Sequence, residues 1–115
     1  MSLPFKQQIL DQDLEDWGVH KRAMEDTAPT TAGANIYTDP DGRAAGIWEC
    51  GPGKYRLERA SDELCVVLQG HWKLIGDEGD NYELRAGDVI YLKKGWKGIS
   101  HVIETIRKVY MTNNL

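Results

Sequence analysis

The sequence predicts an all-β fold, a small jelly-roll barrel preceded by an N-terminal arm. From residue 35 onward, eight or more short apolar runs alternate with glycine, proline, aspartate and asparagine, a pattern typical of a sandwich or barrel. No helical stretch of ten residues separates these runs, which argues against βαβ units. The 115-residue length suits one domain that buries about two thirds of its unfolded surface.

The expected strands of this barrel occupy residues 35–115. They cover residues 36–38, 44–49, 55–58, 64–68, 72–75, 82–84, 89–92, 102–103 and 106–111. A tight turn is expected at Gly51-Pro52-Gly53, because proline presets φ and glycine tolerates positive φ. The apolar run that begins at Leu64 is expected to end at Gly70, as a buried strand bounded by turns does.

Residues 1–34 are predicted to form the arm. Leu10, Leu14 and Trp17 recur at helical spacing among acidic residues, so a short amphipathic helix can form there and end at Gly18. The next stretch is small and polar, which indicates extended chain without a core of its own. We expect such an arm to pack against a partner subunit.

Composition narrows the classes of partner and the compartment. The net charge is −4 and no basic stripe is present, which argues against nucleic-acid binding. No apolar run approaches the ~20 residues of a membrane helix, and the first residues lack a basic segment followed by an apolar one, so neither a membrane nor secretion is expected. Cys50 and Cys65 lack metal or CxxC spacing, which suits the cytoplasm. We interpret them as buried core thiols, with a redox pair as the alternative.

The most informative single residue is Glu63. It heads an apolar run, and the alternation of a strand places it on the same face as Cys65 and Val67. If that face points inward, Glu63 is a buried carboxylate that requires a partner or a chemical role.

Two spaced motifs resemble those of the cupins. Six residues separate Glu63 from Gly70, as at the end of the first cupin motif, and Gly87, Lys93 and Gly95 fit the second, with lysine where proline is usual. Between residues 43 and 112, the segments GIWECGPGKYR, DELCVVLQG, LRAGDVIYLKKGW and IRKVY are similar to small single-domain cupins related to ureidoglycine aminohydrolase and to the ethanolamine-utilisation cupins. The resemblance implies a double-stranded β-helix barrel and a homodimer.

The resemblance also implies a metal site, and this sequence departs from it. Cupin metals are usually held by two histidines and a glutamate of the first motif and one histidine of the second. The histidine positions here hold Leu57 and Arg59, or Arg56 and Glu58 with one more loop residue, and Gly98. His20, His71 and His101 are each expected at the surface or rim. We therefore expect no metal and no cofactor.

Cationic and aromatic side chains replace the missing ligands. Arginine presents a planar fork that suits carboxylate or phosphate, and ligand pockets are mostly apolar with a few polar groups. We predict Glu63 as a candidate catalytic acid/base, and as ligand-binding residues Trp48, Lys54, Tyr55, Arg56, Arg59 and Tyr91. The alternative is an internal ion pair between Glu63 and an arginine that fills the vacated site.

Three functions remain open. The first is binding of a small anionic or amide-bearing metabolite inside the barrel. The second is a metal-independent enzyme, resembling an amidohydrolase or lyase, that uses Glu63 as acid/base. The third is a structural or assembly protein with a filled barrel. Phosphate-loop, GxSxG, HExxH and dinucleotide-binding motifs are absent from the sequence.

Overall fold

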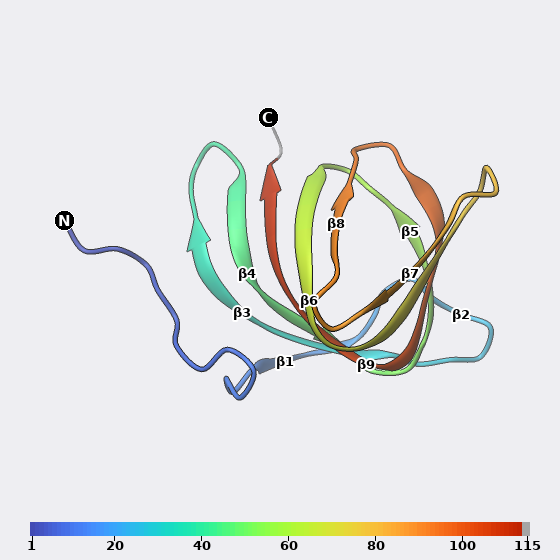
Figure 1. Cartoon of the computed structure of the whole chain (residues 1–115), viewed down its shortest axis with the longest axis horizontal. Helices are drawn as coiled ribbons and strands as arrows, with labels where there is room; N and C mark the ends of the chain where they lie inside the picture. The colour runs from blue at the N-terminus through green and yellow to red at the C-terminus, as the bar shows by residue number, and fades with distance from the viewer. Residues whose placement is uncertain (114–115) are drawn as a thin grey trace.

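The computed structural model describes residues 1–113, which form one curled antiparallel sheet of nine strands (Figure 1). The strands are β1 (Glu15–Val19), β2 (Ala23–Met24), β3 (Thr30–Thr38), β4 (Arg43–Cys50), β5 (Gly53–Glu58), β6 (Asp62–Gly76), β7 (Asn81–Arg85), β8 (Val89–Leu92) and β9 (Lys97–Asn113). No helix forms in this part of the chain, and so none that could span a membrane. The predicted all-β jelly-roll fold is confirmed.

The two longest strands, β6 and β9, organise the sheet. They pair with each other along most of their length. The first half of β9 also pairs with β5 and its second half with β4, while β6 pairs with β8 and then with β7. Each long strand therefore pairs with a different short strand along each half of its length. The twist of the two long strands curls the sheet around a common interior.

Both long strands were expected as separate pieces. The chain does not turn at Gly70: β6 continues through this residue, which has a φ of 98° and lies where the register with β9 shifts between Val67 and Trp72. A glycine with positive φ inside a strand marks an irregularity of the ladder rather than its end. The runs expected at 102–103 and 106–111 likewise belong to the single strand β9. The turn after Cys50 is confirmed.

The prediction of a short helix near the N-terminus is wrong. Residues before Glu15 lie outside the strands, and β1 pairs with β3. Leu10 remains 54% exposed and the Trp17 indole lies against Gly33, so no apolar face packs as a helix would require. Isolated helices of this length are marginal in water, whereas pairing with β3 satisfies the backbone directly. A division of the chain between residues 34 and 35 stays a prediction, although β3 crosses it.

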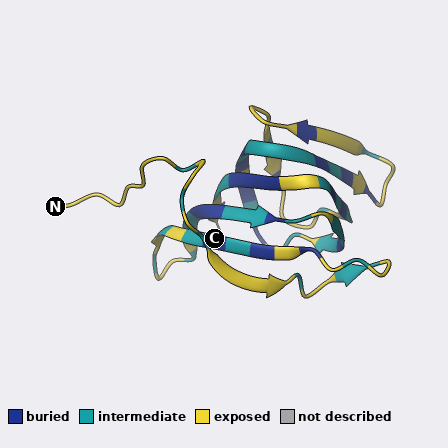
Figure 2. Cartoon of the chain, turned by 90° about the horizontal axis from the view of Figure 1, so that it is seen from below, coloured by how far each residue is buried: buried dark blue, intermediate teal, exposed yellow. Residues whose placement is uncertain are grey.

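The core fills the interior of the curl. Alternate residues of the central strands point inward, and Figure 2 shows buried segments along them and exposed residues along the N-terminal segment. The largest fully buried side chain is Trp72, whose Nε1–H donates to Ser100 Oγ at 2.7 Å. This bond satisfies both buried polar groups and fixes the indole ring.

Candidate functional site

A cavity of about 200 Å³ lies inside the curl, and the core residue Trp72 forms part of its lining. Strands β4, β5, β6, β8 and β9 supply most of its walls, the loop after β1 supplies His20, and the loop between β5 and β6 supplies Arg59. Its lining residues are His20, Trp48, Tyr55, Leu57, Arg59, Glu63, Trp72, Leu92, Lys108 and Tyr110. The walls are mostly aromatic and apolar, with three charged groups among them.

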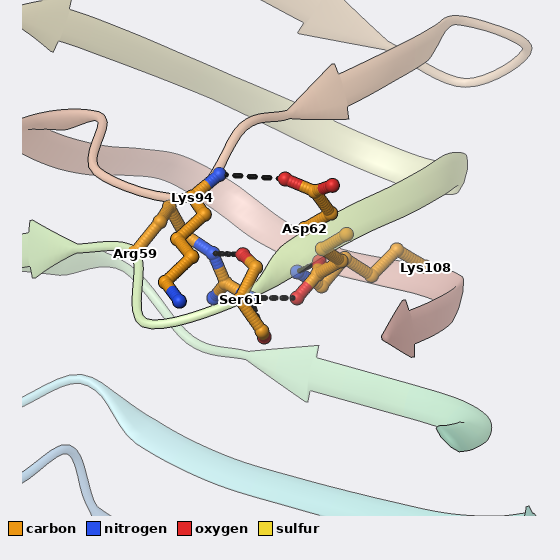
Figure 3. A network of polar contacts seen from close by, with 6 residues as sticks. Arg59, Ser61, Asp62, Lys94 and Lys108 are labelled. Atoms are coloured by element: carbon orange, nitrogen blue, oxygen red, sulfur yellow. Dashed lines mark hydrogen bonds and ion pairs between the residues drawn. The ribbon is translucent and has the colours of Figure 1, made fainter. Parts of the chain in front are cut away.

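The three charged groups form one cluster at the start of β6. Glu63 is 5% exposed; its Oε2 accepts a hydrogen bond from Lys108 Nζ at 2.5 Å, and its Oε1 lies 3.2 Å from Arg59 Nη2. Arg59 and Lys108 approach from opposite sides (Figure 3). Arg59 also donates from Nε and Nη2 to the carbonyl and hydroxyl of Ser61. Both carboxylate oxygens therefore have a cationic partner.

The aromatic walls help to keep the Lys108 ammonium buried. Its Nζ lies 4.7 Å from the ring centroid of Trp48 and 5.1 Å from that of Trp72. A cation over the face of an indole ring is attracted by the ring quadrupole, and more so when water is excluded. Lys108 therefore compensates its lost hydration through one carboxylate and two rings.

The carboxyl group of Glu63 remains ionised at neutral pH. Burial acts to raise its pKa, but the charge of Lys108, the hydrogen bond from Lys108 and the charge of Arg59 together outweigh burial, so the pKa is lowered. Two cations face one carboxylate, which leaves an excess of one positive charge in the cavity. Within residues 1–113, Arg59 Nη1 has no protein acceptor.

His20 closes one side of the cavity from the loop between β1 and β2. Its ring stacks on Tyr55 with centroids 3.8 Å apart and planes at 19°. Its Nδ1 accepts a hydrogen bond from the Arg22 backbone N–H at 3.1 Å, so the neutral ring carries its proton on Nε2. Burial, and then the charge of Arg22, lower the pKa of His20, which favours this neutral form.

Four of the residues predicted for the site line this cavity: Trp48, Tyr55, Arg59 and Glu63. Their convergence follows from strand alternation, because Trp48 shares a face with Cys50 on β4 and Glu63 shares one with Cys65 on β6. Their roles in catalysis or ligand binding stay predictions.

The other three predicted residues lie elsewhere. Lys54 and Arg56 alternate with Tyr55 on β5 and therefore point away from the cavity, where Lys54 Nζ bonds Glu25 at 2.7 Å and Arg56 pairs with Asp77. Tyr91 is 55% exposed on the outer face of β8, and its hydroxyl donates to a carboxylate oxygen of Asp62 at 3.0 Å. The structure does not bring these three side chains to the cavity.

Sequence reasoning missed six lining residues: His20, Leu57, Trp72, Leu92, Lys108 and Tyr110. A signal existed for Lys108, because alternation between Ile106 and Tyr110 places all three on one face of a strand. No local signal existed for His20. Its position depends on the pairing of β2 with β5, which joins Ala23 to Tyr55 across a long separation in sequence.

The residues present do not fit the metal site of the cupin motif. Among residues 1–113, no group of three or more histidine, cysteine, aspartate or glutamate side chains gathers to hold a metal ion. The one motif ligand that remains, Glu63, already faces Lys108 and Arg59, whose charges oppose a bound cation.

The two cysteines are expected to resist alkylation in the native protein. Both are free and fully buried, and burial raises the pKa of Cys50 to about 12 and of Cys65 to about 11. Because the thiolate is the reactive species, neither should react at neutral pH. A thiol titration with an aromatic disulfide should find two reactive groups only after unfolding; reaction in the native protein would contradict the burial.

Comparison with known proteins agrees with this fold. The family model of the EutQ-like cupin domain matches residues 38–110. The structure of EutQ from Clostridium difficile has 22% identity and a TM-score of 0.66, covering 75% of this chain and 64% of that one. A putative ethanolamine utilization protein of Salmonella typhimurium has 23% identity and a TM-score of 0.65, covering 74% and 70%.

A protein of unknown function from Pseudomonas syringae pv. tomato has 17% identity and a TM-score of 0.79, covering 90% of this chain and 45% of that one. At these identities the structural likeness shows the fold alone. The curated proteins compared with the chain yield no match. The family model, however, spans most of the chain and all the strands from β4 to β8. The chain belongs to the family of EutQ-like cupin domains.

Proposed function

We propose that the protein binds a small anionic or amide-bearing metabolite in the cavity beside Glu63. The observation that carries this proposal is the excess positive charge inside an aromatic-lined cavity. Arg59 and Lys108 face a single carboxylate, and Arg59 Nη1 is left for an acceptor from outside the protein. An anionic ligand would balance the charge, and an amide oxygen would accept from the same nitrogen.

The cavity limits the size of the ligand. Its volume of about 200 Å³ is below the ~300–1,000 Å³ of pockets that enclose drug-sized molecules. The ligand is therefore a compact molecule, with a flat or apolar part against Trp48 and Tyr55 and its acceptor group at Arg59. The sequence resemblance to ureidoglycine aminohydrolase suggests ureido carboxylates as ligands, because they combine a flat ureido group with a carboxylate acceptor. The two free thiols suit a cytoplasmic protein.

The state of Glu63 favours binding over acid/base catalysis. General acid or base catalysis is most efficient when the pKa lies near the working pH, whereas the pKa of Glu63 is lowered and both its oxygens are occupied. The cavity itself disfavours the third alternative, a barrel filled by its own side chains.

The test is calorimetric titration with N-carbamoylglycine and acetate, with acetamide as the neutral comparison. We expect saturable binding of at least one of the three by the wild type. R59M should weaken it about 10-fold or more, since a charge-assisted hydrogen bond contributes about 1.5–3 kcal/mol.

The matched control is R56M, which removes an arginine three residues away that points out of the barrel. It should leave affinity within about twofold. No binding of any probe at millimolar concentration, or equal losses in R59M and R56M, would contradict the proposal. Consumption of N-carbamoylglycine by the wild type would instead favour the enzyme.

A further inference from the structure

His20 brings a hydrogen-bond donor without a protein partner to the cavity. Its Nδ1 accepts from the backbone N–H of Arg22 at 3.1 Å, so the neutral ring carries its proton on Nε2. Within residues 1–113, Nε2 makes no hydrogen bond to protein. No fully buried side-chain nitrogen of these residues lacks a partner, so Nε2 is accessible, and His20 lines the cavity. The ring therefore offers Nε2–H to a molecule bound there.

The ring of His20 is held in place by its contacts. One face stacks on Tyr55, which is 3% exposed, with the ring centroids 3.8 Å apart. The backbone is fixed as well, because the His20 N–H donates to the carbonyl of Pro29 at 2.9 Å and the His20 carbonyl accepts from the N–H of Ala23 at 3.2 Å. A donor that is fixed before the ligand arrives loses little entropy on binding. Nε2–H is therefore a preorganised donor.

The same surroundings keep His20 uncharged. Protonation would place a second N–H on Nδ1, opposite the backbone N–H of Arg22, and would break the bond between them. Burial, and then the charge of Arg22, lower the pKa of the ring. Arg22 itself pairs with Glu58 at 3.6 Å, outside the cavity lining. His20 is therefore a neutral donor at neutral pH.

The other titratable groups of the cavity offer no free anion to a charged imidazole. They are the ion cluster of Arg59, Glu63 and Lys108 and the phenols of Tyr55 and Tyr110. Both oxygens of Glu63 are occupied by the two cations. Burial raises the pKa of both phenols, which stay neutral. The cavity therefore combines a cluster that has one positive charge in excess with a separate neutral donor.

We propose that His20 is a ligand-binding residue that sets specificity: its Nε2–H donates to a neutral carbonyl of a ligand whose carboxylate lies at Arg59. This role rests on the proposed function, and it narrows the ligand to a monocarboxylate that carries an amide or ureido carbonyl. A neutral donor suits a neutral carbonyl, because a second carboxylate would be desolvated beside an uncharged ring. One carboxylate also balances the positive charge in excess, whereas two would leave a negative charge in excess.

Three compounds of equal chain length test this role in calorimetric titrations at neutral pH. N-carbamoylglycine, succinate and butanoate share one carboxylate and end in a carbamoyl group, a second carboxylate and a methyl group, respectively. The wild type should bind N-carbamoylglycine about 10-fold or more tighter than succinate, because only succinate brings a second charge into the cavity. Succinate that binds as tightly as N-carbamoylglycine would overturn the preference for a neutral carbonyl.

The variant H20F separates the donor from the stacked ring. Phenylalanine keeps a ring against Tyr55 and removes both nitrogens. The N–H of Arg22 then loses its acceptor, but this residue is exposed and water can replace it. Affinity for N-carbamoylglycine should fall about fivefold, as expected for one neutral hydrogen bond, while affinity for butanoate stays within about twofold. Retained binding of butanoate shows that the variant is folded.

Proton uptake on binding tests the charge state of His20. Since the ring binds as a neutral donor, the wild type should bind N-carbamoylglycine without taking up a proton. The binding enthalpy should then be the same in phosphate and in Tris, two buffers with different enthalpies of ionisation. Uptake of a proton by the wild type that H20F abolishes would mean that a charged imidazole binds the ligand, and would overturn the neutral donor.

The matched control is H101F, which changes a histidine on β9 that is in register with Lys54 and Lys73 and does not line the cavity. It should change neither affinity. Unchanged affinity of H20F for N-carbamoylglycine, or equal losses of N-carbamoylglycine and butanoate, would overturn the role of His20 and leave the proposed function standing. No binding of any probe by the wild type would instead contradict the proposed function itself, and this role with it.

Discussion

K108M is expected to lower the free energy of unfolding by about 3 kcal/mol at neutral pH, the lower end of the loss seen when one partner of a buried ion pair is removed. The methionine is close to lysine in length, so packing against Trp48 and Trp72 is largely kept. Glu63, however, would remain 5% exposed with Arg59 as its remaining cation. Denaturant unfolding measures the loss.

Two further variants separate charge from packing. E63Q in the K108M background should recover most of the loss, because no buried carboxylate is left without compensation. The matched control is K54M, which breaks a Lys–Glu contact of 2.7 Å whose side chains are 31% and 50% exposed. A surface pair contributes about 0–1 kcal/mol, so K54M should have little effect. Similar losses in K108M and K54M would contradict the assignment of a buried pair.

The pH dependence follows from the lowered pKa of Glu63. Since the folded pKa lies below the unfolded one, the pair contributes fully above the unfolded value of about 4.3 and its contribution is lost as pH falls through the folded pKa. The difference in stability between wild type and K108M should therefore shrink on acidification from pH 7 to pH 3. A difference that is constant across this range would mean that the charge of Glu63 plays no part.

The sequence predicted the fold because its signals are local. Alternation and turn residues identify strands without knowledge of their partners, and they correctly placed Glu63 on the same face as Cys65, which the structure shows to be the inward one. The cation that neutralises Glu63 was missed for a different reason. The positions that motif histidines would occupy lie around residues 56–59 and at Gly98, whereas Lys108 comes from the last strand, in register with Trp48.

Other parts of the site depend on contacts that no local pattern encodes. His20 reaches Tyr55 because β2 pairs with the edge of β5, and two residues of strand give no periodicity to detect. Lys54 and Arg56 adjoin Tyr55 in sequence, and this proximity predicts a single cluster. On a strand, however, neighbours in sequence point to opposite faces of the sheet. The structure therefore places Lys54 and Arg56 on the outer face and Tyr55 on the inner one.

Substitution of Gly70 is expected to destabilise the fold strongly, because this glycine allows β6 to continue where the sequence indicated its end. Its φ is 98°, and a Cβ built there would lie 2.2 Å from the carbonyl oxygen of Thr105 on β9. G70A should therefore force the two central strands apart. It should lower the free energy of unfolding by about 3 kcal/mol or more, because backbone strain and steric overlap with β9 add together.

The matched control is G79A, at a φ of 92° with no atom within 4 Å of the added Cβ. It carries only the left-handed penalty of about 1–2 kcal/mol. The excess loss in G70A over G79A, measured by denaturant unfolding, isolates the contact with β9. Equal losses would mean that β9 moves aside without a measurable cost in free energy. The close approach at Gly70 would then not fix the register of β6 and β9, the two strands that hold Glu63 and Lys108.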